Sequence, residues 1–192
     1  MVDFEIVLRW MDYIRSNPEQ AYRFSENFWP SQIASKRRLL DRLPKASNYT
    51  VFGGWYGILA QMIQHKYPFA SVTNVDVDPT CKGVFDHINQ NTKINHVTSC
   101  MSSYDMSSLS NDSVLVNTST EHVPQDIYDL WWNSIPEGKI YIIQGNNLII
   151  DEHVRPTDDL EEFLTKNHAH NAFHVEEIDC GTFTRFMAIA IK

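Results

Sequence analysis

A glycine-rich segment at residues 51–57 is the first candidate for binding chemistry. It reads Val51-Phe52-Gly53-Gly54-Trp55-Tyr56-Gly57 and joins a predicted strand to a predicted helix. Glycine permits a tight turn and lets a ligand lie against the backbone N–H groups at the start of a helix. A plain tight connection in an α/β protein explains such a turn equally well, so the segment alone identifies no ligand.

Acidic residues beyond the next two predicted strands make the binding interpretation more specific. Asp76 lies 19 residues after Gly57, at the end of the second predicted strand. A carboxylate there can accept both ribose hydroxyls of a nucleoside that lies over the glycine turn. Asp105, in Tyr104-Asp105-Met106, can receive an adenine amino group, although an ordinary loop aspartate explains it as well. Asp78 is followed by proline and is more typical of a helix entry.

Two Glu-His pairs and an asparagine are the candidates for catalysis. Glu121-His122 follows the fourth predicted strand. His122 can accept a proton near neutral pH, and Glu121 can orient it or the acceptor. A helix-entry cap is the structural alternative for this pair. Asn146 leaves the fifth predicted strand with amide donors and acceptors. His153 lies with Glu152 in the following loop, which is either a lid or an exposed segment.

Metal binding is not predicted for these groups. Glu121, His122, Glu152 and His153 are suitable ligand types, but their spacing matches no metal-binding motif. The tract at residues 168–174 contains three histidines that are predicted to lie on the surface.

An alternation of strands and helices after residue 48 positions the candidate residues. The predicted strands are Tyr49–Gly53, Ser71–Val77, His96–Cys100, Ser113–Thr118, Lys139–Gln144, Phe173–Ile178 and Phe183–Ile191. The predicted helices are Ile58–His65, Thr80–Gln90, Gln125–Ser134 and Glu161–Asn167. This order predicts a Rossmann-like α/β fold, a mostly parallel sheet with helices on both faces. The last two strands, joined by a turn at Asp179–Gly181, predict an antiparallel hairpin.

Residues 1–44 are predicted to be helical, and the whole chain, 1–192, is predicted to form one domain with a core at 48–192. Phe4, Val7, Leu8, Met11 and Ile14 recur at helical spacing. Ser31 is predicted to cap a helix that Pro44 ends. Lys36, Arg37, Arg38, Arg42 and Lys45 form a basic cluster that is typical of a solvated helix face.

Composition indicates a cytoplasmic protein. The net charge of −8 opposes a general affinity for nucleic acid. Three cysteines far apart in sequence favour a reduced compartment over a disulfide framework. The acidic N-terminus does not resemble a signal peptide, and no apolar run approaches the roughly 20 residues of a membrane helix.

The ordered motifs together resemble the class I S-adenosylmethionine (SAM)-dependent methyltransferases over roughly residues 48–192. The glycine segment, the acid at Asp76, the Glu121-His122 pair and the Pro-x-Gly turn at Ile135–Lys139 carry the resemblance. More narrowly, it resembles small stand-alone methyltransferases encoded by bacteriophages, of unassigned specificity. It implies SAM as cofactor and a set of cofactor-binding residues: Gly53, Gly54, Trp55, Tyr56, Gly57, Asp76, Val77, Asp105, Met106 and Asn117.

The chain departs from the family pattern at the glycine segment. Val51 and Phe52 stand where the family has an acid that positions the methionine amino group, and Trp55 replaces a middle glycine. A non-catalytic SAM-fold binding module therefore stays open as an alternative, as does another SAM-consuming reaction such as SAM cleavage.

Missing motifs narrow the methyl acceptor. The chain has neither the (Asp/Asn)-Pro-Pro-(Tyr/Phe) signature of amino-group methylation on DNA bases nor the Pro-Cys nucleophile of cytosine-C5 enzymes. The resemblance then implies transfer to an O or N atom of a small molecule, or of a limited feature of a protein or RNA. Neither duplex DNA nor a membrane is expected as a partner.

Overall fold

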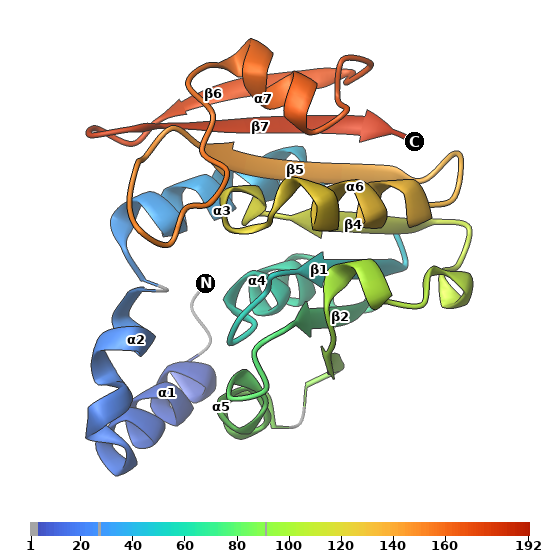
Figure 1. Ribbon diagram of the computed structural model, residues 1–192. Coiled ribbons are helices and arrows are strands. Elements are labelled where there is room, and N and C mark those ends of the chain that lie inside the picture. The colour runs from blue at the N-terminus through green and yellow to red at the C-terminus, as the bar shows by residue number, and fades with distance from the viewer. Residues whose placement is uncertain (1–3, 27, 91) are drawn as a thin grey trace.

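A seven-stranded sheet with strand order β3-β2-β1-β4-β5-β7-β6 organises the chain (Figure 1). The computed structural model describes residues 4–26, 28–90 and 92–192. Strands β1 to β5 are parallel, and β7 pairs antiparallel with both β5 and β6. The strands are β1 (Asn48–Phe52), β2 (Ser71–Asp76), β3 (Ile94–Thr98), β4 (Ser113–Asn117), β5 (Ile140–Asn146), β6 (His174–Asp179) and β7 (Thr184–Ile191).

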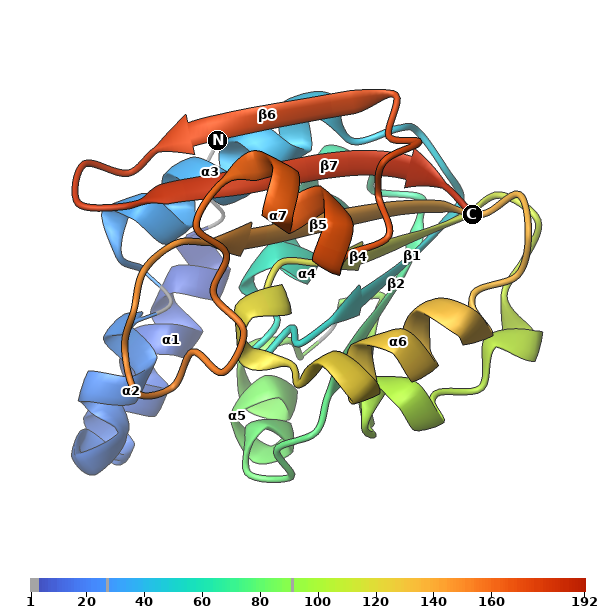
Figure 2. The ribbon, with the colours of Figure 1, turned by 45° about the horizontal axis from the view of Figure 1, so that its top comes forward.

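Helices cover both faces of this sheet, and the N-terminal ones extend beyond its edge (Figure 2). The α-helices are α1 (Phe4–Ser16), α2 (Ala21–Glu26), α3 (Pro30–Arg42), α4 (Ile58–Lys66), α5 (Cys81–Ile88), α6 (Gln125–Ser134) and α7 (Leu160–Lys166). Four short 3-10 helices are η1 (Pro18–Gln20), η2 (Met101–Ser103), η3 (Met106–Ser108) and η4 (Thr120–His122). Within the described ranges, no helix combines the length and apolar character of a membrane span.

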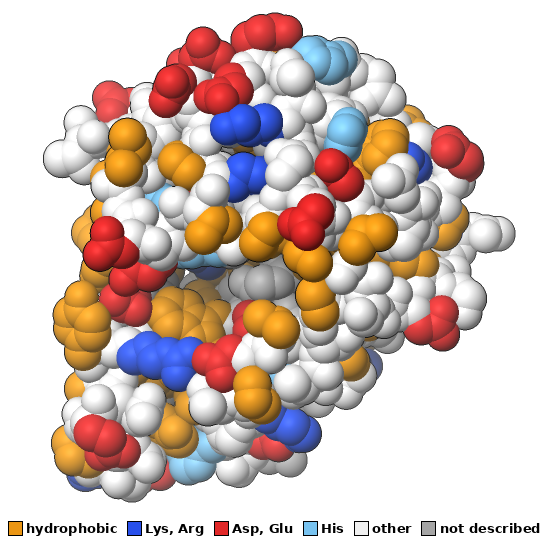
Figure 3. Space-filling view, in the orientation of Figure 1, with side chains coloured by type: hydrophobic (Ala, Val, Ile, Leu, Met, Phe, Trp, Pro, Cys, Tyr) orange, Lys and Arg blue, Asp and Glu red, His pale blue; other side chains and the backbone are white. Residues whose placement is uncertain are grey.

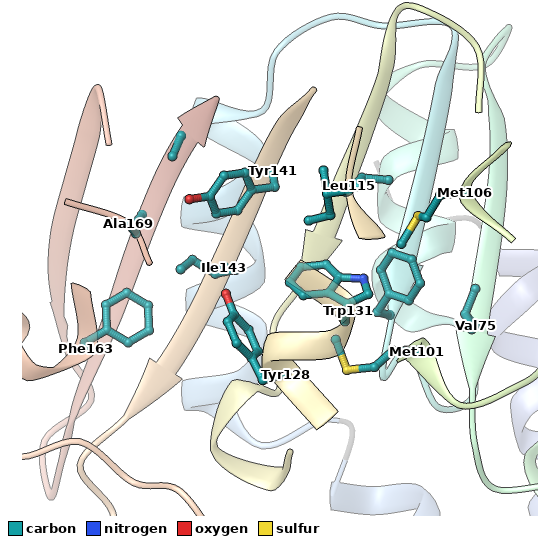
Figure 4. Close-up of a cluster of buried hydrophobic side chains, with 14 of the residues drawn as sticks. Val75, Met101, Met106, Leu115, Tyr128, Trp131, Tyr141, Ile143, Phe163 and Ala169 are labelled. Atoms are coloured by element: carbon teal, nitrogen blue, oxygen red, sulfur yellow. The ribbon is translucent and has the colours of Figure 1, made fainter. Parts of the chain in front are cut away.

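The central strands are buried because apolar side chains project from both of their faces. On one face, α6 and α7 pack on Phe52, Tyr141 and Ile143, and Trp131 lies at the centre (Figure 4). Trp131 is fully buried. On the opposite face, α3 and α4 cover a second apolar cluster that includes Leu39, Leu59, Val72, Val116 and Ile142.

The predicted α/β class, parallel sheet and antiparallel C-terminal hairpin are confirmed. Two boundaries differ in ways that affect the site. The third strand is Ile94–Thr98, two residues earlier than predicted. The fifth strand continues to Asn146 because its end pairs with β7, where Asn146 lies opposite Arg185.

The apolar residues that recur at helical spacing in α1 do not all lie on its buried face. Leu8 and Met11 are exposed, whereas Trp10, Tyr13 and Ile14 pack on an aromatic cluster that includes Phe24 of α2. The side chain of Phe4 lies outside the described residues. Helix α3 begins with proline at its first position after Trp29, and no side chain caps it, so the prediction that Ser31 is the cap was wrong.

Candidate functional site

A cavity of about 870 Å³ opens at the carboxyl ends of the parallel strands (Figure 3). The turn after β1 and the segment after β4 both line it, and the strand order reverses between these two neighbours. Ligands of open α/β sheets bind at this kind of switch point. Helices α2 and α3 and the segment after β5 complete the wall, with Tyr22, Glu26, Trp29, Gln32, Leu148 and Ile150. The volume lies in the upper part of the roughly 300–1,000 Å³ range of small-molecule sites.

The turn after β1 brings backbone close to the second strand. Gly53 has φ +59°, and Gly54 lies so near β2 that a Cβ on it would be 1.9 Å from Asn74 Oδ1. Asn74 is itself held in place, since its Nδ2 donates to the Trp55 carbonyl. Only glycine fits at residue 54, and three of the predicted cofactor-binding residues, Gly53, Gly54 and Trp55, line the cavity.

Asp76 lines the cavity beside this turn. Its Oδ2 accepts a 2.8 Å hydrogen bond from the Trp55 N–H, and its Oδ1 accepts a 2.9 Å bond from the Asp78 N–H. A carboxylate has about four acceptor sites, so both oxygens keep capacity for ligand hydroxyls. Val77, which follows, also lines the cavity and is exposed.

An ion pair ties the N-terminal helices to this end of the cavity. Arg23 of α2 pairs with Asp78 and donates to Thr80 Oγ1. Its guanidinium also lies 5.5 Å from the ring centroid of Trp55 and 5.7 Å from that of Tyr56. The hydrogen bonds from Thr80 and Arg23 hold the pKa of Asp78 at about 2. Asp78 is thus more than a helix entry, because it positions one wall of the cavity.

Five of the predicted cofactor-binding residues do not line the cavity. Tyr56 is buried with α2 and α5, and Met106 belongs to the core. Asp105 is exposed and accepts the Ser107 N–H, which makes it a local cap. Asn117 is buried under the site, where its Oδ1 accepts the Ser119 N–H. The cavity wall beyond β3 consists instead of Ser99, Cys100 and Met101.

Gly57 is the fifth predicted cofactor-binding residue that does not line the cavity, and it is needed for its backbone conformation. It has φ +82°, and a Cβ on it would be 2.6 Å from the ring of Phe85. A side chain at this position would therefore meet the core rather than a ligand in the cavity.

Replacing Gly57 by alanine is expected to destabilise the fold by about 1–2 kcal/mol or more, since the left-handed conformation alone costs that much. Gly83, in α5, is the matched control, because nothing lies within 4 Å of a Cβ built there. Gly83→Ala is expected to stabilise the protein by about 0.4–1 kcal/mol. Urea unfolding of both variants measures the change in the free energy of unfolding, which is expected to have opposite signs in the two. Equal effects would contradict this account of Gly57.

At the other end of the cavity, Asn146 and Arg185 line the wall and contact Glu121, a predicted site residue that is buried behind it and does not line the cavity. Glu121 Oε1 accepts a hydrogen bond from Asn146 Nδ2 and lies 3.5 Å from Arg185 Nη1. The side chains of Glu121 and Arg185 are each 2% exposed. Arg185 also donates to the Thr118 carbonyl at 3.2 Å.

His122 and His153 face each other across the cavity wall, with ring centroids 4.6 Å apart. His122 Nδ1 donates to the Glu152 carbonyl at 3.0 Å, and His153 Nδ1 donates to the Leu148 carbonyl at 2.6 Å. A carbonyl only accepts, so the proton of each neutral ring lies on Nδ1 and Nε2 keeps a lone pair. The three histidines of the 168–174 tract pair with three separate acids: His168 with Asp129, His170 with Glu161, and His174 with Glu176.

Lys36 is a cavity residue that sequence reasoning missed. Its Nζ donates to Gln32 Oε1 at 2.8 Å within α3. Burial first, and then the nearby Arg185 charge, lowers the pKa of Lys36 to about 7, against the opposing effect of Glu121. A neutral amine is therefore abundant near neutral pH in the cavity wall.

Solved structures share this fold, whereas neither a family model nor a curated protein sequence matches the chain. PigF with S-adenosylhomocysteine (SAH) superposes with a TM-score of 0.67 at 13% identity over 95% of this chain, which spans 62% of PigF. A geranyl diphosphate C-methyltransferase from Streptomyces coelicolor A3(2) has a TM-score of 0.65 at 11% identity, covering 83% of this chain and 77% of that one. The chain has the class I methyltransferase fold. A third structure with this fold, 1,6-didemethyltoxoflavin-N1-methyltransferase of Burkholderia thailandensis, has a TM-score of 0.65 at 13% identity and covers 97% and 88% of the two chains.

Proposed function

We propose that this protein is a SAM-dependent methyltransferase that acts on an O or N atom of a small molecule or of a limited feature of a protein or RNA. The observation that carries the proposal is the cavity at the strand-order reversal, with the glycine turn on one side and Asp76 at the end of the next strand. The structures of similar fold that are named above support it, since all three contain SAH and two are named as methyltransferases.

The residues at the β1–β2 end of the cavity fit a nucleoside. Asp76 retains acceptor capacity for two ribose hydroxyls after its two backbone hydrogen bonds. Gly53 and Gly54 allow a ligand to approach the backbone. Met101 and its neighbours after β3, rather than Asp105, are placed to contact the base. Val51 and Phe52 are fully buried apolar residues, so any contact to the methionine amino group comes from elsewhere in the wall.

The other end of the cavity has the groups that an acceptor needs. SAM supplies an electrophilic methyl group, so the protein has to align the acceptor, exclude water and remove a proton where the acceptor is neutral. Asn146 and Arg185 offer hydrogen-bond donors, and Lys36 offers an amine with its pKa near 7. We assign proton removal to Lys36. Base catalysis by His122 stays a prediction from the sequence.

A small methyl acceptor fits this site better than duplex DNA does. Helices α2 and α3 and the segment after β5 contribute side chains to the cavity wall. Apolar side chains, among them Trp29, Val123, Leu148 and Ile150, line the same cavity as Asn146 and Arg185. We therefore propose an acceptor with an apolar body and one polar reacting group, in a protein that works in the cytoplasm.

Asp76→Asn is expected to weaken SAM and SAH binding by roughly tenfold to over a hundredfold, because charge-assisted hydrogen bonds to a ribose are worth about 1.5–3 kcal/mol. Asparagine keeps one oxygen for the backbone N–H groups, whereas alanine would leave both of them without a partner. Isothermal titration calorimetry with SAH measures the change.

Asp105→Asn is the matched control for this experiment, since Asp105 is an exposed acid outside the cavity. It is expected to leave SAH affinity unchanged. Unchanged affinity in a folded Asp76→Asn protein would remove Asp76 from the site. If the wild type binds neither SAM nor SAH, the proposal of a SAM-dependent enzyme fails. Tight SAM binding without transfer to any acceptor would favour the binding module.

A further inference from the structure

Three potential metal ligands converge where the polar end of the cavity meets the loop after β5. One ligand atom each of Glu121, His122 and His153 can be chosen so that all three lie within 4.8 Å of one another. They come from η4 and from a loop about 30 residues later, so sequence spacing does not reveal the group. Glu152, the fourth candidate in the sequence, contributes only its backbone carbonyl, which holds His122.

The two histidines are oriented as metal ligands require. In metal sites the non-ligating ring nitrogen usually donates to a carbonyl or carboxylate, which fixes the tautomer and ring orientation. His122 and His153 both do this through Nδ1, to the carbonyls of Glu152 and Leu148. Both Nε2 lone pairs are thereby left for a cation, and both side chains line the cavity.

Glu121 has one carboxylate oxygen that receives no hydrogen bond from the described residues. Glu121 Oε1 takes the hydrogen bond from Asn146 and the contact with Arg185. Glu121 Oε2 is buried and has no hydrogen-bond partner among the residues that the structure describes. A buried carboxylate oxygen without a partner is costly, and a bound cation would remove that cost.

From these contacts we infer that Glu121, His122 and His153 form a binding site for a divalent transition metal ion such as Zn²⁺. Two imidazoles and one carboxylate suit Zn²⁺ and Fe²⁺ better than Mg²⁺. Ligand atoms around one tetrahedral Zn²⁺ lie about 3.4 Å apart for bonds of about 2.1 Å. The ligand atoms of the three side chains lie within 4.8 Å of one another, so the side chains have to move closer together when the ion binds.

His122 and His153 line the cavity, so a coordination position left open by the three protein ligands would be reached from it, as in a metal site that binds substrate. The ligand at this position would be an anionic or ionisable oxygen, because the Arg185 guanidinium adds positive charge beside it. Bound to Zn²⁺, His122 Nε2 cannot accept a proton, so His122 is a ligand and Lys36 the proton acceptor. The roles of the metal ion and of Lys36 in catalysis rest on the proposed methyl transfer, whereas metal binding itself does not.

Calorimetric titration of the chelator-treated full chain with ZnCl₂ near pH 7.5, without SAM, tests the site. One ion is expected to bind per chain. Loss of a ligand should cost at least the roughly 10–100-fold that outer-shell substitutions cost. His153→Ala is the deciding variant, since His153 lies on a partly exposed loop where truncation leaves the core intact. Glu121→Gln and His122→Ala are expected to lose affinity to a similar degree.

His170→Ala is the control for adventitious binding, because the His170 side chain is 56% exposed and lies outside the cavity. It is expected to bind Zn²⁺ as the wild type does. Wild-type binding no tighter than that of His153→Ala, or an equal loss in His170→Ala, would overturn the inference. Zn²⁺ binding in a protein that binds no SAM would leave the metal site standing and refute the methyltransferase.

Discussion

Replacing Lys36 by methionine is expected to lower methyl-transfer turnover by about 10²–10⁴-fold, with SAM affinity close to that of the wild type. Lys36 lines the cavity, and the charges that act on its amine are those of Arg185 and Glu121, at the polar end. Its pKa of about 7 follows from burial and from the charge of Arg185. A base with this pKa is matched to neutral pH, where the free amine and its conjugate acid are both populated.

The pH dependence of turnover separates a base from a packing residue. Wild-type turnover is expected to rise with pH through about 7, as Lys36 loses its proton, and then to level off. Lys36→Met and Lys36→Arg are both expected to lose this rise, because neither side chain accepts a proton in that range. A Lys36→Arg enzyme with wild-type turnover and the same pH profile would exclude Lys36 as the base.

The Lys36 amine can also be titrated without knowing the acceptor. NMR of the reductively ¹³C-methylated protein should show one lysine that titrates near 7 while exposed lysines titrate near the usual value of about 10.4. In the unfolded chain this amine has its ordinary pKa, so the unfolded state binds more protons between pH 7 and pH 10.5. Stability therefore rises with pH across that window. Lys36→Met should exceed the wild type in stability most at pH 6 and least near pH 10.

The role of Lys36 could not be predicted from the sequence because it depends on which side of a helix meets the sheet. Lys36 and Arg38 are neighbours in a basic cluster, but two residues along an α-helix correspond to about 200° of rotation. Arg38 accordingly points outward and pairs with Glu176, whereas Lys36 faces the cavity. Which of them is buried is decided by the packing of α3 on the sheet, a tertiary contact without a local signal.

The fold was predictable because its signal is local. Buried parallel strands appear as short apolar runs, and the helices between them have caps, prolines and periodic apolar residues. Asp105 shows where this reasoning stops. The third strand ends at Thr98, so the residues that reach the cavity are Ser99, Cys100 and Met101, and Asp105 lies beyond a further turn. The third strand ends two residues earlier than predicted, so the segment that reaches the cavity lies earlier in the chain than Asp105.

The convergence of Glu121, His122 and His153 likewise depends on a loop whose course is set by Arg155. The Arg155 side chain is 6% exposed, and its ring contact is with Tyr128, 4.2 Å from the guanidinium carbon to the ring centroid. Its guanidinium donates to groups of three separate segments, namely the carbonyls of Thr120, Val123 and Lys166 and the side chains of Gln125 and Asn167. Its backbone N–H donates to the Glu121 carbonyl at 2.9 Å. One side chain therefore joins η4, the start of α6 and the end of α7.

Arg155→Met is expected to destabilise the protein by about 3–5 kcal/mol, because it leaves several buried acceptors without donors at about 1–3 kcal/mol each. Methionine keeps an apolar chain of similar length, so the loss reflects hydrogen bonding more than volume. Urea unfolding followed by circular dichroism gives the change. Arg38→Met is the matched control, since Arg38 is an exposed arginine paired with Glu176, and it should cost less than about 1 kcal/mol. Similar values for the two variants would show that Arg155 does not hold these segments together. A large loss confined to Arg155→Met, with Zn²⁺ and SAH binding weakened in the fraction that stays folded, would show that this buried guanidinium positions the polar end of the cavity.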